Sequence, residues 1–147
     1  MCSSDLLRIW EESKQDMQQE PWKEFSKTVE ELFRCRLLPP EYSNQQPFIV
    51  AEYIPEALRP EGRIGPRLDI ANAGSGFHQV LLLLAFLFAR PSSVLLLDEP
   101  DAHLHVLLQR TIFERLKQVA FNRRCQLIVA THAEVLLEGS SPEEILS

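Results

Sequence analysis

The sequence predicts an α/β fold, because two short apolar segments flank one amphipathic helical segment. Residues 94–97 read Val-Leu-Leu-Leu and residues 126–130 read Gln-Leu-Ile-Val-Ala, which is typical of β-strands. Between them, residues 103–120 carry apolar side chains at helical spacing. A strand, a helix and a strand at this spacing form a βαβ unit, whose strands are parallel with a right-handed crossover. All-apolar strands also predict a sheet that is buried on both faces.

The residues before this unit predict a helical segment over 1–40 and a hairpin with a loop over 41–70. Residues 48–54 are apolar and β-prone, and residues 67–70 predict a returning strand. From residue 71 onward, a glycine-bearing turn leads into a helix over 77–89. In the helical segment, Pro21 suits a first helical turn, and an apolar stripe follows it at steps of three and four: Trp22, Phe25, Val29, Leu32 and Phe33.

Composition excludes several classes of protein. The chain has 147 residues, with 15 Lys or Arg and 21 Asp or Glu, so its formal net charge is −6. Hydrophobic residues make up 45% and charged residues 24%, which excludes a disordered chain and a strongly basic nucleic-acid-binding protein. A basic pair, Arg123-Arg124, falls in a predicted loop, where we expect a solvated turn rather than a nucleic-acid patch.

The cysteines and the apolar segments indicate where the protein is located. Cys2, Cys35 and Cys125 have no C-x-x-C spacing, which favours reduced thiols in a cytoplasmic protein. The N-terminal residues lack the basic and apolar regions of a signal peptide. The longest apolar run, residues 80–89, is much shorter than the roughly 20 residues that a membrane span needs. We therefore expect no membrane contact.

Two acids, Asp98 and Glu99, follow the first strand of the βαβ unit. Ligands of open parallel sheets bind beyond the carboxyl ends of the strands, where these acids lie. A bound Mg²⁺ would relieve their mutual repulsion; Asp98 would then hold the metal, and Glu99 would act on a water molecule as general base. The alternative is a pair of solvated acids at a strand end.

A histidine and a glycine-bearing turn add to this pattern. His132 follows the second strand, where its imidazole would hydrogen-bond a phosphate oxygen or an attacking water; a structural histidine is the alternative. Gly74-Ser75-Gly76 precedes a helix, whose N-terminal amides attract phosphate, although such glycines often form only a turn.

A metal site is a further possibility, because His103 and His105 lie two residues apart. Residues at this spacing do not share a helix face, so both would bind one metal only from a loop. A metal-dependent hydrolase that uses Asp98, Asp101, His103 and His132 is therefore the weaker alternative.

Taken together, the motifs resemble a known family. Gly-Ser-Gly-Phe-His-Gln79, an apolar helix, Leu-Leu-Leu-Asp-Glu-Pro-Asp-Ala-His-Leu-His105 and Val-Ala-Thr-His132 occur in this order. Over residues 70–138 the chain resembles the C-terminal half of the nucleotide-binding domain of ABC-type ATPases. Within these, it resembles the branch that includes the overcoming-lysogenisation-defect (OLD) ATPases, RecF and structural-maintenance-of-chromosomes (SMC) proteins. It is most similar to the AAA-type ATPases of the OLD group, which act on DNA.

The resemblance implies roles for individual residues and implies ATP and Mg²⁺ as cofactors. Asp98 resembles the Walker B magnesium ligand, Glu99 the catalytic base and His132 the switch histidine. Ser75 and Gly76 resemble the signature motif, which contacts the γ-phosphate of ATP held by the other protomer. The segment from Asp101 to His105 resembles the D-loop. The chain departs from the family pattern at three positions, where a glycine, an acid or amide, and a serine are usual: Phe77, His78 and Ala133.

The chain contains no G-x-x-x-x-G-K-[ST] sequence, the loop that cradles the phosphates. The resemblance therefore implies that residues 1–147 are the C-terminal half of an ABC-type or OLD-like ATPase domain, with a P-loop NTPase-like parallel sheet that is incomplete. In this interpretation residues 71–147 form its signature, Walker B, D-loop and switch-histidine core. We expect a homodimer or a P-loop-bearing partner chain, DNA contacts through regions outside this chain, and no ATP hydrolysis by the chain alone. The alternative is a non-catalytic interaction module that docks on such a partner.

Overall fold

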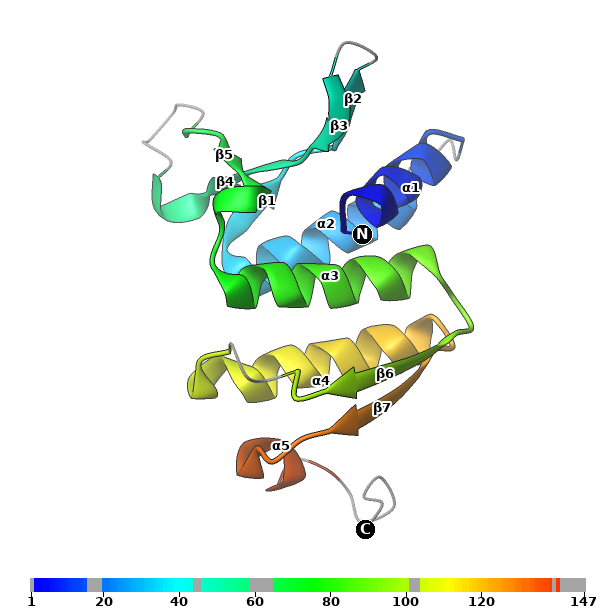
Figure 1. Cartoon of the computed structure of the whole chain (residues 1–147), viewed down its shortest axis with the longest axis vertical. Coiled ribbons are helices and arrows are strands. Elements are labelled where there is room, and N and C mark those ends of the chain that lie inside the picture. Colours follow the sequence, from blue (N-terminus) through cyan, green and yellow to red (C-terminus); the bar gives the residue numbers. More distant parts are fainter. Residues whose placement is uncertain are drawn as a thin grey trace. The chain divides into compact units, whose positions relative to one another are not determined.

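The computed structural model describes residues 2–15, 20–43, 46–58, 65–100, 104–138 and 140 (Figure 1). The chain divides into two compact units, Met1–Ala89 and Arg90–Ser147. The first unit contains the predicted helices and hairpin, and the second contains the βαβ unit.

Three helices form the core of the first unit: α1 (Cys2–Gln15), α2 (Glu20–Phe33) and α3 (Ser75–Ala89). Helix α1 packs against both α2 and α3. Pro21 lies in the first turn of α2, as predicted. The buried Ser13 joins two helices, because its Oγ accepts a hydrogen bond from the Trp22 amide at 2.7 Å and donates one to the Ile9 carbonyl at 2.8 Å. Ser13 thereby satisfies an amide at the start of α2 that has no partner within the helix.

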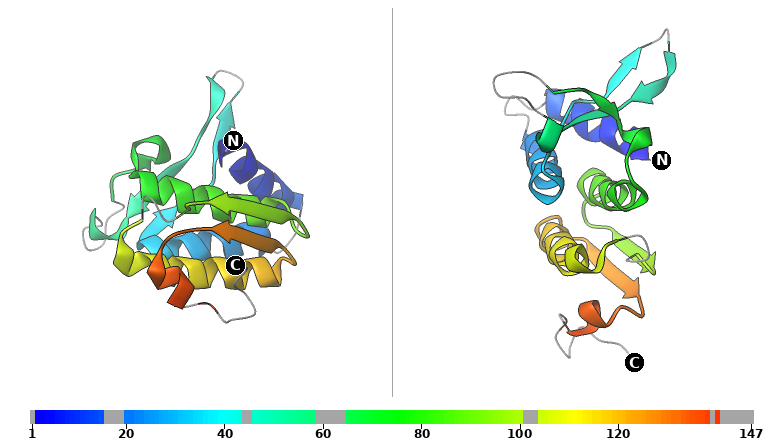
Figure 2. Two further views of the ribbon diagram at one scale, coloured as in Figure 1. Left: turned by 60° about the horizontal axis from the view of Figure 1, so that its bottom comes forward. Right: turned by 90° about the vertical axis from the view of Figure 1, so that its left-hand side faces the viewer.

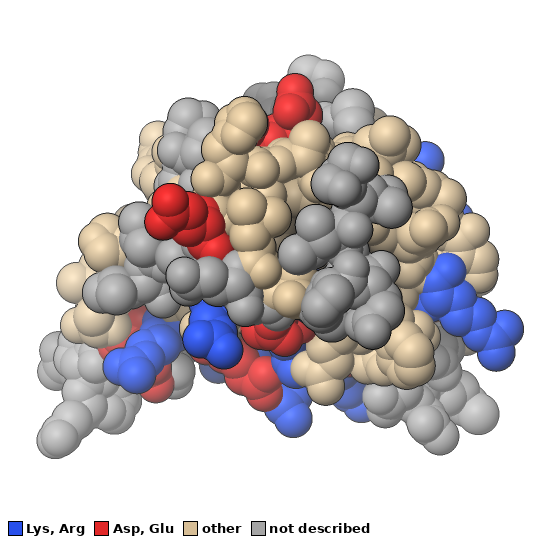
Figure 3. Space-filling model, turned by 90° about the horizontal axis from the view of Figure 1, so that it is seen from below, with Lys and Arg blue, Asp and Glu red and all other residues tan. Residues whose placement is uncertain are grey.

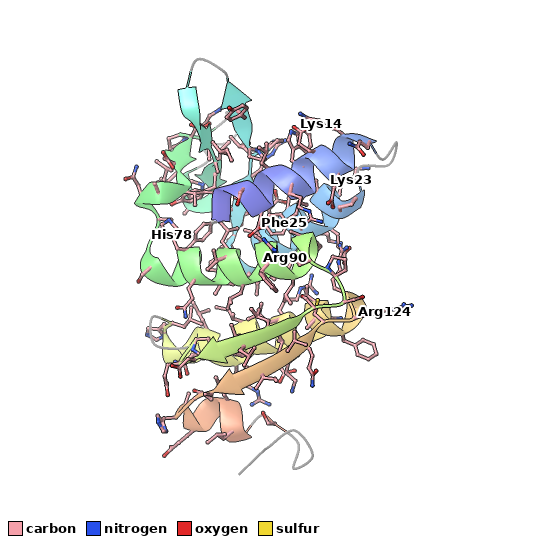
Figure 4. All side chains as sticks on the ribbon, turned by 45° about the vertical axis from the view of Figure 1, so that its right-hand side comes forward. Lys14, Lys23, Phe25, His78, Arg90 and Arg124 are labelled. Atoms are coloured by element: carbon pink, nitrogen blue, oxygen red, sulfur yellow. The ribbon has the colours of Figure 1, made fainter. Side chains whose placement is uncertain are left out.

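Aromatic side chains fill the space between these helices. The Phe25 ring is fully buried (Figure 4), and its centroid lies 5.6 Å from the Trp22 ring and 5.4 Å from the Phe88 ring. Such tilted and edge-on contacts are favourable for aromatic rings. The apolar stripe predicted for α2 therefore faces the core, since Trp22, Phe25 and Val29 are all buried.

Two antiparallel sheets complete the first unit. One has the order β1 (Cys35–Leu37), β4 (Glu52–Pro55), β5 (Leu68–Asp69), and the other pairs β2 (Glu41–Ser43) with β3 (Gln46–Val50). Single turns of 3₁₀-helix follow β4 and β5 at η1 (Glu56–Leu58) and η2 (Ile70–Asn72).

The structure confirms the predicted hairpin but corrects the predicted strand over 48–54. Tyr53 pairs with Leu68, so β4 and β5 form the expected hairpin. The segment 48–54, however, is divided between β3 and β4, which belong to different sheets. The division falls at the buried Ala51, whose carbonyl accepts a hydrogen bond from the Ile70 amide at 2.9 Å. This partner lies far away in the sequence, so local patterning could not reveal the break.

The second unit contains β6 (Val94–Asp98), α4 (Val106–Asn122), β7 (Gln126–Ala130) and α5 (Glu134–Glu138). Strands β6 and β7 are parallel, with Leu96 opposite Ile128, which confirms the predicted βαβ unit. Helix α4 packs against β7 (Figure 2). The helix begins at Val106 rather than at the predicted residue 103; residues 101–103 and the capping sequence at residues 141–144 lie outside the described residues.

The prediction that both strands are buried on both faces is wrong. Alternate residues of each strand are exposed, and Val94, Leu96 and Ile128 are 50%, 73% and 43% exposed. Helix α4 packs on the sheet through β7, and the apolar residues of the other face remain open in the described part of the chain. None of the described helices is long and apolar enough to cross a membrane.

We expect Phe25→Ala to lower the free energy of unfolding of the first unit by about 3–5 kcal/mol, because it leaves a cavity beside Trp22 and Phe88. Both tryptophans, Trp10 and Trp22, lie in this unit, so urea unfolding followed by tryptophan fluorescence measures its stability. Leu58→Ala is the matched control, since Leu58 is 49% exposed and its loss should change stability by only about 0.5 kcal/mol. Equal effects of the two substitutions would contradict this packing.

A second prediction concerns the buried Cys35. Burial raises the pKa of the Cys35 thiol from 9.0 to about 11, and the Glu30 carboxylate adds to the rise. The native state therefore keeps this proton where the unfolded chain has lost it. The thiol's contribution to stability is complete below about pH 9 and falls as the pH rises towards about 11. Urea unfolding across this range should show a larger alkaline loss of stability in the wild type than in Cys35→Ala. Parallel pH profiles would contradict the burial of the thiol.

Candidate functional site

The predicted site residues of the second unit lie where β6 and β7 end. Asp98 is the last residue of β6 and pairs in register with Ala130, the last residue of β7. Because the strands are parallel, the residues that follow them leave the sheet at the same edge. The structure thus brings Glu99 and His132 together, although 32 residues separate them in the sequence.

Glu99 is held in a conformation that L-residues rarely adopt. Its φ is 45°, in the left-handed region, and its amide donates a hydrogen bond to the Ala130 carbonyl at 2.8 Å. This bond extends the pairing of β6 with β7 by one residue and fixes the backbone from which the carboxylate projects. Strained residues of this kind often occur at functional sites.

The Glu99 carboxylate faces the imidazole of His132. Their Oε1 and Nε2 atoms are 3.6 Å apart, and the pair becomes an ion pair when the imidazole is protonated. The Glu99 side chain is 40% exposed and the His132 side chain is 99% exposed, so both can reach a ligand from solvent. The two groups therefore suit proton transfer or hydrogen bonding at a shared ligand atom.

A short turn positions His132. The Thr131 hydroxyl accepts a hydrogen bond from the Ala133 amide at 3.0 Å, and α5 begins at the next residue. Sequence reasoning assigned no role to Thr131. The signal was a threonine three residues before a helix start, whose hydroxyl can close a turn by accepting a hydrogen bond from an amide two residues later.

Asp98 is exposed at the end of β6 and offers oxygen ligands. Mg²⁺ prefers oxygen and is usually held by one or two carboxylates together with water and phosphate, so the residues fit this ion. Among the residues that the structure describes, no group of three or more His, Cys, Asp or Glu side chains could hold a metal ion. The weaker alternative, a hydrolase metal centre, stays a prediction, because Asp101 and His103 lie outside the described residues.

His105 lies just before α4, not on it. Its carbonyl accepts hydrogen bonds from the amides of Leu108 at 2.8 Å and Gln109 at 3.2 Å, so its main chain begins the helix. The Gln109 side chain in turn donates to the Leu104 carbonyl at 3.2 Å. The His105 residue itself is exposed.

Ser75 and Gly76 belong to the first unit and are the first two residues of α3. The Gly74 carbonyl accepts the His78 amide at 3.1 Å, so the amides of the residues between them have no carbonyl partner within the helix. A Cβ atom at Gly74 would meet nothing within 4 Å, so no steric contact requires glycine there. The amides at this helix start suit an anionic ligand.

Phe77, which replaces a glycine of the family pattern, anchors this turn. Its ring centroid lies 4.6 Å from the Phe33 ring of α2 and 5.1 Å from the Tyr53 ring of β4. Sequence reasoning treated Phe77 only as a departure and missed this packing role. Gln79, two residues later, has a buried Oε1 atom with no hydrogen-bond partner in the described structure.

The first unit also contains a hollow of about 680 Å³ that includes none of the predicted site residues. Trp10, Lys14, Tyr42 and Arg67 are among the residues that line it. Two acids lie close to its cations, with Lys14 2.8 Å from Glu11 and Arg67 3.5 Å from a carboxylate of β4. Because these cations are already paired with carboxylates, the hollow does not favour an anionic ligand.

One known family matches most of the chain. Residues 23–138 match the family described as "AAA domain, putative AbiEii toxin, Type IV TA system". The match covers most of the chain, which therefore belongs to this AAA-domain family. None of the curated proteins compared with the chain matches it.

Solved structures of SMC heads share the fold. One, from "Structural biochemistry of ATP-driven dimerization and DNA stimulated activation of SMC ATPases", is 19% identical with a TM-score of 0.58 and covers 80% of this chain and 70% of that chain. The Smc head of Pyrococcus yayanosii is 25% identical with a TM-score of 0.57, covering 84% and 24%. That of Pyrococcus furiosus, bound to a ScpA domain, is 23% identical with a TM-score of 0.57, covering 88% and 33%.

These likenesses confirm the predicted fold class. The chain is an α/β protein with a partial P-loop NTPase fold, similar to the SMC ATPase head. It spans only about a quarter to a third of the two Pyrococcus chains that it matches.

We expect Glu99→Gly to leave the second unit equally stable or more stable by about 1 kcal/mol, because glycine adopts a positive φ without steric cost. Glu99→Ala is the matched control, since it also removes the carboxylate but keeps the strained backbone. Amide hydrogen exchange of residues 94–98 and 126–130 measures the difference. Slower exchange in the alanine variant than in the glycine variant would contradict strain at this residue.

Proposed function

We propose that the edge formed by Asp98, Glu99 and His132 is the metal-binding and catalytic half of an ATP-hydrolysing site. The observation that carries this proposal is the parallel register, which places Asp98 at a shared edge with Glu99 and His132, 3.6 Å apart. Membership of the AAA-domain family and the likeness to SMC heads support ATP and Mg²⁺ as the cofactors.

Each side chain has a separate role in this proposal. Asp98 holds Mg²⁺, which when bound supplies charge stabilisation to the phosphates. Glu99 accepts a proton from the water that attacks the γ-phosphate, and its fixed backbone limits the directions that the carboxylate can take. His132 donates a hydrogen bond to the same region from its exposed position.

The other predicted ligands complete the proposal. The amides of Ser75 and Gly76 at the start of α3 contact the γ-phosphate of ATP held by another protomer. Asp101 and His105 belong to a D-loop that communicates between protomers. In this view the chain divides into a helical segment (1–40), a hairpin and loop (41–70) and an ATPase core (71–147).

The site requires a phosphate-binding loop that the sequence does not contain. We propose that a P-loop-bearing polypeptide supplies it, so that the chain acts as part of a DNA-linked ATPase of the OLD-like or SMC-like type, as a homodimer or with a partner. The net charge of −6 places the main DNA contacts outside this chain. One structural relative is described by ATP-driven dimerization and DNA-stimulated activation, which is consistent with this proposal.

A second candidate function is that of a non-catalytic interaction module. The open apolar face of the second unit favours it, because Val94, Leu96 and Ile128 remain exposed. Parallel sheets are normally covered on both faces, so this surface suits a protein partner. The two candidates differ in whether the assembly formed with such a partner hydrolyses ATP.

We expect the purified chain alone to show no measurable Mg²⁺-dependent ATP turnover. In an assembly with a P-loop-bearing polypeptide, Glu99→Gln should lower kcat by about 10²- to 10⁴-fold, because the general base is lost. Glu114→Gln is the matched control, since Glu114 is an exposed glutamate of α4. Phosphate release measures the rates.

Two outcomes would contradict the proposal. If the chain alone hydrolyses ATP at about 1 s⁻¹ and Glu99→Gln leaves this rate unchanged, the role of Glu99 is wrong. If a stable assembly with a P-loop-bearing polypeptide shows no ATP turnover, the interaction module is the better description.

A further inference from the structure

The opposite edge of the second unit carries two turns joined by hydrogen bonds. These turns, residues 90–93 and 121–125, precede β6 and β7. The Ser92 amide donates to the Arg123 carbonyl at 3.0 Å, and the Cys125 Sγ donates to the Arg90 carbonyl at 3.4 Å. Because β6 and β7 are parallel strands of five residues, this edge lies about 15 Å from the edge at Asp98.

Left-handed residues that follow the ends of α3 and α4, as is common at helix ends, fix the backbone of this double turn. Arg124 has a φ of 57° and Ser92 has a φ of 59°, both in the left-handed region. The Arg124 amide donates to the Phe121 carbonyl at 3.1 Å, and the Cys125 amide donates to the Ala120 carbonyl at 2.8 Å. The turn is therefore held in one arrangement rather than free to vary.

An aromatic side chain and a basic side chain project from the turn that follows α4. Phe121 is 83% exposed, more than any other large hydrophobic residue in the described part of the chain. Arg124 is exposed and points away from the protein (Figure 4). Figure 3 shows Lys and Arg side chains at several places on one face of the molecule, including its right-hand edge.

The sequence around this turn has a local positive charge. Residues 115–133 contain no Asp or Glu and four Lys or Arg: Arg115, Lys117, Arg123 and Arg124. The net charge of −6 is a property of the whole chain. It was the reason to expect DNA contacts in regions outside this chain. Because salt screens charges beyond about 8 Å, a ligand at the turn is affected mainly by the local charge.

The basic pair by itself predicted only a solvated turn, but the exposed Phe121 beside it changes that interpretation. We propose that the segment Phe121–Arg124 binds single-stranded nucleic acid, with one base stacked on Phe121 and adjacent phosphates bound by Arg123 and Arg124. Exposed aromatic rings next to arginines are the feature that such sites share, because every base offers a face for stacking. A duplex would use the arginines but would give the exposed ring no unpaired base to stack on. An anionic membrane would take up both the ring and the arginines, so binding to vesicles is one of the outcomes of the test. This contact adds to the proposed function and does not depend on it, since it lies at the other edge of the sheet.

The test measures binding of a fluorescein-labelled oligo-dT of about 15 nucleotides to the full chain by anisotropy, without ATP or Mg²⁺. We expect a Kd of about 10⁻⁶ to 10⁻⁴ M at low salt, weakened about sevenfold between about 50 and 200 mM salt if two phosphates are bound. Phe121→Ala should weaken binding by about 5- to 100-fold, because stacking is lost. Arg124→Glu should weaken binding and reduce its salt dependence.

Matched controls separate this site from general charge effects. Arg110→Glu makes the same charge change at another exposed position of the second unit, and Leu108→Ala removes another exposed apolar side chain. Both should leave the Kd within about twofold of wild type if the turn is the site. The proposal is overturned if oligo-dT does not bind or if the control variants lose as much binding as the turn variants. It is also overturned if a duplex or phosphatidylserine vesicles bind more tightly and Phe121→Ala has no effect. The binding assay contains neither ATP nor Mg²⁺, so failure of the ATPase proposal is recognised separately.

Discussion

The pairing of β6 with β7 is the interaction on which the candidate site depends. The parallel register aligns Asp98 with Ala130, and the Glu99 amide continues the pairing by bonding to the Ala130 carbonyl. Because both strands end at one edge, the acids and the imidazole meet there without any direct sequence proximity. The same register brings the turns that contain Ser92 and Arg123 together at the other edge. One set of backbone hydrogen bonds thus positions both the candidate catalytic edge and the turns at the opposite edge.

The second unit combines backbone conformations that are fixed by hydrogen bonds with an exposed apolar sheet face. Glu99 keeps a left-handed backbone because its hydrogen bond to Ala130 holds it, and residues strained in this way cluster at functional sites. Ser92 and Arg124 follow the ends of α3 and α4, where a left-handed residue commonly terminates a helix. Leu96 and Val94 remain exposed on the open face of the sheet. An apolar sheet face of this kind is unusual in parallel sheets, and it is consistent with a chain that works with another polypeptide.

Sequence reasoning was most reliable where a pattern depends only on local spacing. It located α2, α3 and the strands β6 and β7 closely, because apolar periodicity and flanking prolines act within a few residues. It missed β1 and β2, which are three residues long, and it merged β3 with β4. The packing of Phe77 against Phe33 and Tyr53 also escaped it, since those partners come from distant segments.

The sequence by itself determined the βαβ unit, the family and the identity of the acids and the histidine that follow its strands. Those features are local or depend on motif order. Only the tertiary structure decided that Glu99 and His132 face each other, that the strands have one open face, and that Phe121 is exposed beside Arg124. The physical reason is that exposure and side-chain distance depend on which segments pack together, and a chain's local pattern does not contain that information.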